Sequence, residues 1–170
     1  MKKTIDTENA FFYTELYPKN NKKSAKKFYA LIGIGANIGN LKKTFHKVYF
    51  YLYSMREIDI VKTSPIYENP DFAEAKNPKF FNAAILIKTT LNPLNLLKSL
   101  LKVETRFYRE RPYKNAPRLI DLDIIFYENK VGRNVLYFQD KKAENLAIPH
   151  PFWDKRASVI LPTLNLRGKL

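Results

Sequence analysis

The chain has 170 residues, no cysteine and a formal net charge of +14, and 45% of its residues are hydrophobic. This is the length of about one domain with enough apolar material for a packed core, and without cysteine neither a disulfide framework nor a thiolate metal site can form. The longest apolar runs are far shorter than the roughly 20 residues of a membrane-spanning helix. Because Lys2 and Lys3 precede polar and acidic residues, we expect no signal peptide and a cytoplasmic protein.

Residues 1–27 are rich in lysine and in turn-forming residues, so we expect a basic N-terminal arm of unknown role that is flexible or loosely docked. Its apolar side chains leave open a short helical or extended piece that packs on the rest of the chain; they are Phe11, Phe12, Tyr13 and Leu16. Residues 28–170 are expected to form a single domain.

Apolar patterns in the first half of that domain predict a strand, a helix and two further strands. Residues 28–35 have the apolar, β-branched content of a buried strand, and Asn40 then predicts the N-cap of a helix over 41–55. Residues 58–68 predict a second strand, which Pro65 breaks or confines to an edge. Residues 79–90 predict a third strand.

The second half completes the plan. Asn92 and Pro93 predict the start of a second helix that continues to Tyr108. A basic loop follows, and then a fourth strand over 119–127. The order β-α-β-β-α-β is that of an α+β, ferredoxin-like core, with residues 146–164 as a C-terminal appendage.

The fourth predicted strand carries two aspartates, Asp121 and Asp123. Because side chains alternate between the faces of a strand, both carboxylates should project from one face. The opposite face would then carry Ile120, Leu122, Ile124 and Phe126. Cα atoms about 6.5–7 Å apart suit two carboxylates that bind hard cations such as magnesium together with phosphates. The alternative is a solvated sheet face without a ligand.

The basic residues fall into two groups. The 22 lysines are scattered, which is more typical of a solvated surface than of a binding stripe. Four arginines, in contrast, gather just before the aspartates: Arg106, Arg109, Arg111 and Arg118. Arginines and two metal ions together commonly bind a polyphosphate and stabilise charge during phosphoryl transfer, so this cluster favours a nucleoside triphosphate. The segment GIGANIG indicates only a glycine-rich turn, and no P-loop is present, so side chains should hold the nucleotide.

Three polar or aromatic residues have alternative interpretations. Asn82 interrupts an apolar strand, where its amide either ties down backbone or reads the edge of a polar heterocycle. Phe80, two residues earlier on the same face, either stacks on that heterocycle or packs in the core. His150 is either a ligand of the phosphates or a hydrogen-bonded structural residue, whereas His46 is expected to be structural.

These segments resemble the 6-hydroxymethyl-7,8-dihydropterin pyrophosphokinase family of folate biosynthesis. In chain order, the segments are LIGIGANIGN, TSPIYENP, FFNAAI, KVETRFYR, NAPRLIDLDIIFY and LAIPHPFWDKRASVILPTL. The resemblance covers about residues 28–165. It implies a monomer that transfers the β,γ-diphosphate of ATP to the hydroxymethyl group of the pterin and releases AMP.

The resemblance also implies residue roles. Asp121 and Asp123 would hold two magnesium ions that bridge the ATP phosphates, and the catalytic set would be completed by Arg109 and Arg118. The implied ATP-binding residues are Leu97, Glu104, Arg109, Arg118, Ile124, His150 and Arg156. The implied pterin-binding residues are Ser64, Pro65, Tyr67, Phe80 and Asn82. Loops 69–78 and 109–117 would close over ATP and exclude water.

The family's second pterin-stacking aromatic corresponds to Ser158 in this chain, and Trp153 is the candidate substitute. An RNA-recognition module has the same element order, but it requires an aromatic-rich strand where this chain has RLIDLDIIF. A catalytically inactive interaction domain is disfavoured because the aspartates and arginines are present. We therefore expect ATP and the pterin as partners, no nucleic acid and no membrane. Functional coupling to dihydropteroate synthase, the next enzyme of the pathway, stays open.

Overall fold

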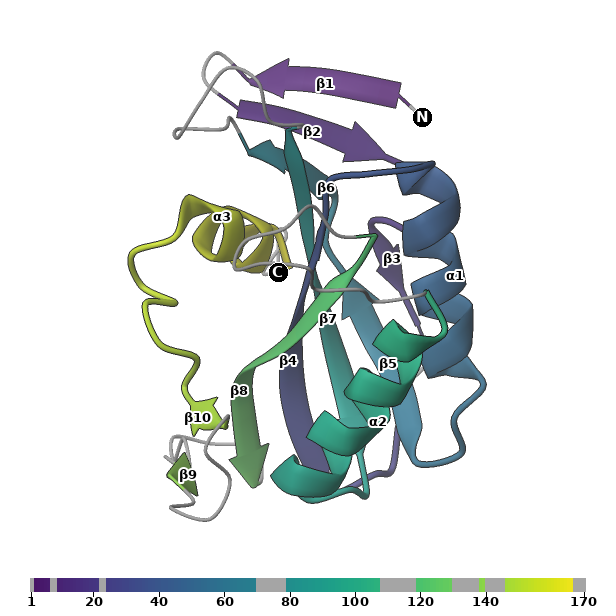
Figure 1. The fold of residues 1–170 in the computed structure, drawn as a ribbon, viewed down its shortest axis with the longest axis vertical. Coiled ribbons are helices and arrows are strands. Elements are labelled where there is room, and N and C mark those ends of the chain that lie inside the picture. The colour runs from purple at the N-terminus through teal and green to yellow at the C-terminus, as the bar shows by residue number, and fades with distance from the viewer. Residues whose placement is uncertain are drawn as a thin grey trace.

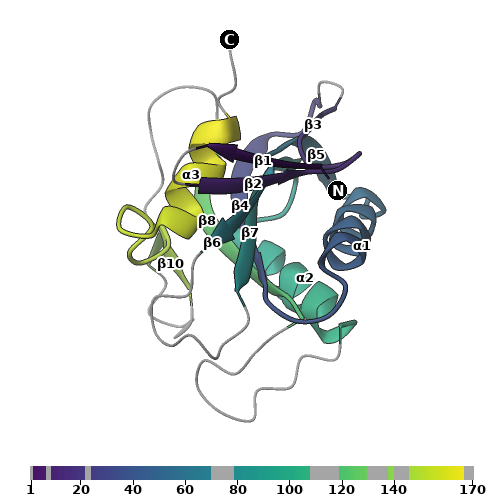
Figure 2. The same ribbon diagram turned by 90° about the horizontal axis from the view of Figure 1, so that it is seen from above.

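The structure is a computed structural model, and it describes residues 2–6, 9–21, 24–69, 79–107, 119–129, 138–139 and 146–166. A largely antiparallel sheet and helices form the molecule (Figure 1), which confirms the predicted α+β class. Two helices cover one face of the sheet, and the third helix lies on the other face (Figure 2). Within the described ranges, no helix is both long and apolar enough to cross a membrane.

The predicted core elements are present in the predicted order. They are β4 (Phe28–Ala36), α1 (Leu41–Tyr53), β5 (Ile58–Thr63), β6 (Ile66–Asn69), β7 (Phe80–Thr89), α2 (Pro93–Thr105) and β8 (Asp121–Asn129). In the sheet, β4 lies between β7 and β8, and β7 pairs on its other side with both β5 and β6. β5 and β6 are the two halves of the predicted strand over 58–68, broken at Ser64 and Pro65. All these pairings are antiparallel, consistent with a ferredoxin-like plan.

Both predicted N-caps are confirmed. The Asn40 side chain accepts a hydrogen bond from the Lys43 amide at 3.0 Å, and the Asn92 side chain accepts one from the Asn95 amide at 2.9 Å. α2 ends at Thr105, earlier than the predicted end at Tyr108, which lies outside the described residues.

The main core lies between the sheet and helices α1 and α2. Alternate residues of the central strand β4 point into it, among them Ile32 and Ile34, which are almost fully buried. The helices contribute residues at helical spacing, which are Phe45, Val48, Tyr49, Leu52, Leu96, Leu100 and Val103. The intervening β4 residues face the other side of the sheet, so β4 contributes to both faces.

A β-bulge in β8 changes the predicted direction of one side chain. Consecutive residues of β4 pair with Ile124 and Phe126, so Ile125 is an extra residue in β8. Ile124 belongs to the main core, whereas Ile125 and Phe126 belong to the apolar cluster on the opposite face. The prediction that Phe126 shares a face with Ile124 is therefore wrong, because strict alternation ends at the bulge.

The C-terminal appendage packs on the face opposite α1 and α2. β9 (Phe138–Gln139) and β10 (Ala147–Ile148) form a separate two-stranded sheet. α3 (Ala157–Leu166) follows and lies against β6 and β7 (Figure 1). Leu166 of α3 packs with Leu31, Ala84 and Ile125 from three strands, so this second cluster holds the helix on the sheet.

The N-terminal segment runs along the edge of the sheet. β2 (Asn9–Tyr13) pairs with β6, β1 (Lys2–Asp6) pairs with the outer side of β2, and β3 (Lys19–Asn20) pairs with β5. Between these pairings, the Thr63 hydroxyl donates to the Leu16 carbonyl at 2.5 Å and accepts from the Lys19 amide at 2.8 Å. The described residues of this arm therefore have the extended alternative and not a loosely docked conformation. They pair with β5 and β6, on both sides of the break at Ser64 and Pro65.

Two residues of this segment, Leu16 and Tyr17, are part of the main core, and Tyr17 is the more deeply buried. Tyr17 is 0% exposed, and its ring lies edge-on to Phe45 with 5.5 Å between ring centroids. Its hydroxyl donates to the Phe45 carbonyl at 3.2 Å. Burial raises the pKa of Tyr17 well above its usual range, so the phenol stays neutral.

Replacement of Tyr17 tests this docking. We expect Tyr17→Ala to lower the free energy of unfolding by about 3–5 kcal/mol, because it leaves a large cavity beneath α1. Tyr13→Ala is the control, since Tyr13 is 37% exposed, and its cost should be within about 1 kcal/mol. Urea unfolding of both variants measures the difference. Equal costs would show that the segment does not pack as described.

Candidate functional site

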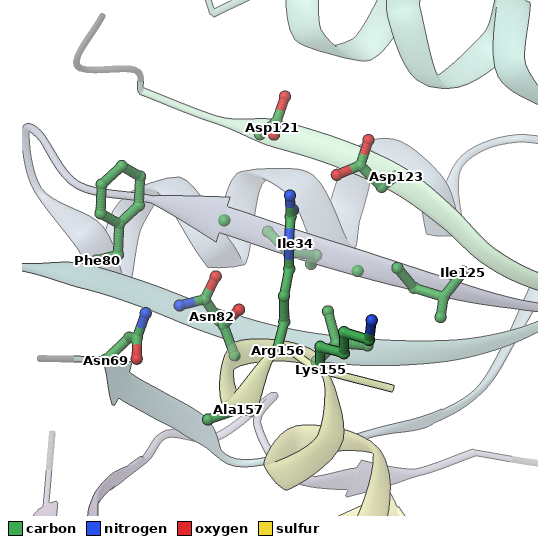
Figure 3. A pocket seen from close by; sticks show the side chains of 14 residues that line it. Ile34, Asn69, Phe80, Asn82, Asp121, Asp123, Ile125, Lys155, Arg156 and Ala157 are labelled. Atoms are coloured by element: carbon green, nitrogen blue, oxygen red, sulfur yellow. The ribbon is translucent and has the colours of Figure 1, made fainter. Parts of the chain in front are cut away.

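A cavity of about 600 Å³ opens on the sheet face opposite α1 and α2. Strands β4, β6, β7 and β8 form its floor, and the segment that leads into α3 forms one wall (Figure 3). Five of the residues predicted for the site line it: Phe80, Asn82, Asp121, Asp123 and Arg156. The volume is typical of a small-molecule site.

Strand register explains why these residues meet. Asp121 pairs with Gly35 across β8 and β4, and Gly35 pairs with Asn82 across β4 and β7. Asn82 pairs in turn with Tyr67 of β6. Directly opposed residues of neighbouring strands face the same side, so these positions form one row across four strands. The row is acidic at one end and carries an amide and a phenol at the other.

Two glycines of β4 leave the middle of the cavity floor without side chains. A Cβ atom at Gly35 would lie 3.3 Å from the Asn82 Oδ1, and one at Gly33 would lie 3.1 Å from the Ile125 Cδ1. Glycine inside a strand often marks the close approach of a ligand. Both glycines lie in the strand predicted over 28–35 and in the segment GIGANIG, but their role in the floor of a cavity was not predicted. Their alternation within an otherwise apolar strand was the signal.

The two aspartates line the cavity together, as the alternation of β8 predicts. The His150 Nε2 lies 4.0 Å from the Asp123 Oδ2, and the His150 backbone amide donates to the Ile125 carbonyl at 3.0 Å. The buried His150 Nδ1 has no hydrogen-bond partner among the described residues. His150 is therefore held beside β8 by its backbone, and its ring is available for a ligand.

The end of the row that carries the aspartates fits a magnesium site with few protein ligands. Within the described ranges, no group of three or more acidic or histidine side chains is suited to hold a metal ion. In the cavity, Asp121 and Asp123 provide two carboxylates. Next to them, Gly33 and Gly35 have no side chain that would fill the space above β4. Magnesium commonly takes one or two carboxylates when phosphates and water complete its shell.

Three residues predicted to lie near ATP are on the helix side of β8 or in the core. Glu104 of α2 is 1% exposed, and its Oε1 accepts a hydrogen bond from the Leu122 amide at 2.7 Å. Ile124 is buried in the main core, and Leu97 packs against that core. None of these three is among the described residues that line the cavity. Glu104 instead fixes β8 between its two aspartates.

Residues of β6 and of the break before it support the other end of the row, near Asn82. The Ser64 hydroxyl donates to the Pro65 carbonyl at 2.7 Å and accepts from the Ala84 amide at 2.9 Å, which fixes the break between β5 and β6. Tyr67 is 3% exposed, and burial raises its pKa. Its ring lies 5.4 Å from that of Phe11 in the N-terminal segment. These residues support the cavity wall that Phe80 and Asn82 line.

The Asn82 side chain lines the cavity with a donor that the described residues do not bind. Its Nδ2 is buried and has no hydrogen-bond partner in the part of the chain that the structure describes. A buried donor of this kind normally has a partner, so Asn82 can donate to a ligand in the cavity. Phe80 is half-buried and lines the same cavity, where a planar ligand could stack on its ring.

The segment before α3 contributes positively charged side chains to the cavity. Lys155 and Arg156 are exposed and line the cavity, and Figure 3 shows the Arg156 side chain projecting across it. Lys155 was not among the predicted site residues. Arg109 and Arg118 lie outside the described residues, as does most of the two predicted closing loops. Ser158 lines the cavity, whereas Trp153 packs on Phe126 with 4.6 Å between ring centroids.

Comparison with known proteins places this geometry in context. The family model of 7,8-dihydro-6-hydroxymethylpterin-pyrophosphokinase matches residues 31–168. A 2-amino-4-hydroxy-6-hydroxymethyldihydropteridine pyrophosphokinase of Campylobacter jejuni is 40% identical over 136 residues, which are 80% of this chain and 81% of that protein. Its counterpart in Helicobacter pylori is 35% identical over 134 residues, 78% and 77% of the two chains. The folic acid synthesis protein fol1 of Pneumocystis carinii is 35% identical over 139 residues, 82% of this chain but 17% of that protein.

The hydrogen bond between Glu104 and β8 can be tested by substitution. We expect Glu104→Leu to lower the free energy of unfolding by about 1–3 kcal/mol, because the Leu122 amide loses its buried acceptor. Glu104→Gln keeps an oxygen at Oε1 and should retain most of the stability. Chemical denaturation of both variants gives the comparison. Equal losses in the two would mean that the bond does not stabilise β8.

Proposed function

The chain belongs to the 7,8-dihydro-6-hydroxymethylpterin-pyrophosphokinase family, and on that premise we propose how the residues of its site act. The activity is ATP-dependent transfer of pyrophosphate to hydroxymethyldihydropterin in folate biosynthesis. The observation that carries our residue assignment is the row across the sheet, with Asp121 at one end, Asn82 and Tyr67 at the other and Gly35 between them. One end suits phosphates with a metal ion, and the other suits a polar heterocycle.

In the reaction, the hydroxymethyl oxygen of the pterin attacks the β-phosphorus of ATP. The bond from that phosphorus to the oxygen shared with the α-phosphate breaks, AMP leaves with the electron pair, and the hydroxyl proton passes to solvent. Such a transfer depends mainly on positioning the two substrates in line and on screening the phosphate charge. The protein therefore needs no dedicated base.

Asp121 and Asp123 are the proposed ligands of two magnesium ions. Their position on one face, beside the open floor at Gly33 and Gly35, supports this assignment. Bound magnesium would screen the negative charge of the phosphates and orient them. The two aspartates alone would otherwise repel a polyphosphate, so the affinity for ATP should depend on the divalent cation.

The proposed nucleotide contacts are cationic or polar. His150, beside Asp123, and Arg156, across the cavity, are assigned to the triphosphate. Arg109 and Arg118 are assigned to the charge that develops during transfer, by resemblance to the family. By resemblance to the family, Glu104, Ile124 and Leu97 are also assigned to the nucleotide, although none of them lines the cavity. Glu104 is proposed to act through β8, because its carboxylate holds the strand between the aspartates.

At the other end of the row, Asn82 is assigned to the polar edge of the pterin and Phe80 to its face. Ser64, Pro65 and Tyr67 are assigned to the wall of this subsite. The Asn82 Nδ2 has no partner among the described residues, which supports the assignment because the pterin would supply an acceptor. The second stacking position, Ser158, lines the cavity without an aromatic ring.

The wider setting is proposed as follows. The enzyme is a cytoplasmic monomer, with its catalytic domain over residues 28–170 and an N-terminal arm over 1–27. Loops 69–78 and 109–117 close over ATP during turnover. Functional coupling to dihydropteroate synthase is proposed because a matched relative, fol1, is named for folic acid synthesis and is much longer than this chain.

The first experiment asks whether AMP forms in step with pterin consumption. Protein, ATP, magnesium and 6-hydroxymethyl-7,8-dihydropterin are mixed, and the nucleotides are separated by chromatography. We expect pterin-dependent AMP, and we expect Asp121→Ala to lower kcat by roughly 10²-fold or more, because charge screening in the transition state is lost. Asp59→Asn, outside the cavity, should leave the rate within about twofold of the original.

Two outcomes would contradict the proposal. ADP as the nucleotide product would exclude diphosphate transfer. A fully active Asp121→Ala variant with unchanged magnesium dependence would remove Asp121 from the metal site while leaving the family's reaction in place.

A further inference from the structure

Phe11 of β2 lies outside the part of the chain that matches the family model, which begins at residue 31. β2 pairs with β6 at the edge of the sheet (Figure 1), and the register sets Phe11 directly opposite Tyr67. Because Tyr67 pairs in turn with Asn82, Phe11 adds a fifth strand to the row that includes the cavity floor. The N-terminal segment therefore reaches the same face of the sheet as the candidate site.

Phe11 and its neighbour Phe12 face opposite sides of the sheet. The Phe12 ring lies 5.5 Å from that of Phe81, and it packs against the main core. The Phe11 ring lies 5.4 Å from that of Tyr67, with 46° between the ring planes. Tyr67 is buried, yet it is part of neither apolar cluster of the described residues. Phe12 thus holds the segment on the core, whereas Phe11 contacts a residue next to the candidate site.

Tyr67 stands between Phe11 and Asn82 in the row. Side chains that are directly opposed on paired strands have Cβ atoms about 4.5–5.5 Å apart, so the Tyr67 side chain limits the directions open to the Asn82 amide. Aromatic pairs prefer defined relative orientations, so the contact with Phe11 favours one position of the Tyr67 ring. Without the Phe11 ring, Tyr67 would have space to turn toward β2 and away from Asn82.

We propose that Phe11 is a positioning residue of the pterin subsite, because it holds Tyr67 against Asn82 and so fixes the amide that binds the pterin edge. The inference rests on the proposed function, and it extends the subsite to a segment outside the family match. Phe11 is not among the described residues that line the cavity. Its loss should therefore weaken pterin binding and leave ATP binding and the chemical step unchanged.

Phe11→Ala tests this role in a steady-state assay of AMP formation. We expect the KM for the pterin to rise about fivefold, which corresponds to about 1 kcal/mol and lies within the range for an aromatic pair. The kcat and the KM for ATP should stay within about twofold. Phe11→Tyr keeps the ring and should restore the KM for the pterin to nearly its original value.

Phe12→Ala is the matched control, because it removes the same side chain from the next position on the opposite face. It should lower the melting temperature at least as much as Phe11→Ala does, and it should leave the KM for the pterin within about twofold. Thermal unfolding without ligand gives the first comparison, and the AMP assay gives the second.

A role in stability alone gives a different pattern. The KM for the pterin would then rise equally in Phe11→Ala and Phe12→Ala, and that result, or an unchanged KM in Phe11→Ala, would overturn the inference. If Phe11→Ala does not fold, Phe11→Leu is measured in the same way and judged by the same criterion. Failure of the original protein to form pterin-dependent AMP would instead count against the proposed function.

Discussion

The pairing of β4 with both β7 and β8 is the constraint on which the site depends. It sets Gly35 opposite Asn82 on one side and Asp121 on the other, so three strands contribute to one row. The apolar residues of β4 fix this register, since Ile32 and Ile34 must enter the main core. A slip of one residue in β8 would turn both aspartates toward α2 and bury them without partners. The hydrophobic pattern of the sheet thus also determines the position of its carboxylates.

Anionic and neutral polar groups of the site stand on paired strands, whereas its cationic groups come from connecting segments. Asp121 and Asn82 are fixed by backbone hydrogen bonds to their neighbours, while Arg156 is exposed in the segment before α3. This division suits a diphosphate transfer. Groups that bind the reacting centre need a fixed geometry, and long basic side chains can follow the phosphates as substrates enter and leave.

Features that depend on neighbouring residues in the chain could be predicted from the sequence, whereas features that depend on the partner strand could not. The caps at Asn40 and Asn92 and the strand break at Pro65 follow from the residues themselves, so they were predicted correctly. The direction of Phe126 was not, because a bulge depends on the partner strand. Asn69, which lines the cavity at the end of β6, and the β4 glycines were missed for the same reason. Their importance appears only when the neighbouring strands are known. Arg109 and Arg118 lie outside the described residues, so their predicted roles stay predictions.

The N-terminal segment has a consequence for the order in which the protein can fold. Leu16 and Lys19 bond to Thr63, which lies 47 and 44 residues later in the chain. During synthesis β2 and β3 leave the ribosome before β5 and β6, so the sheet edge with which they pair is not yet available. These contacts close long loops, and such closures are slow compared with the formation of α1. The strands β2 and β3 are therefore made before their partners yet pair among the last, and until β2 pairs, β6 has an open edge.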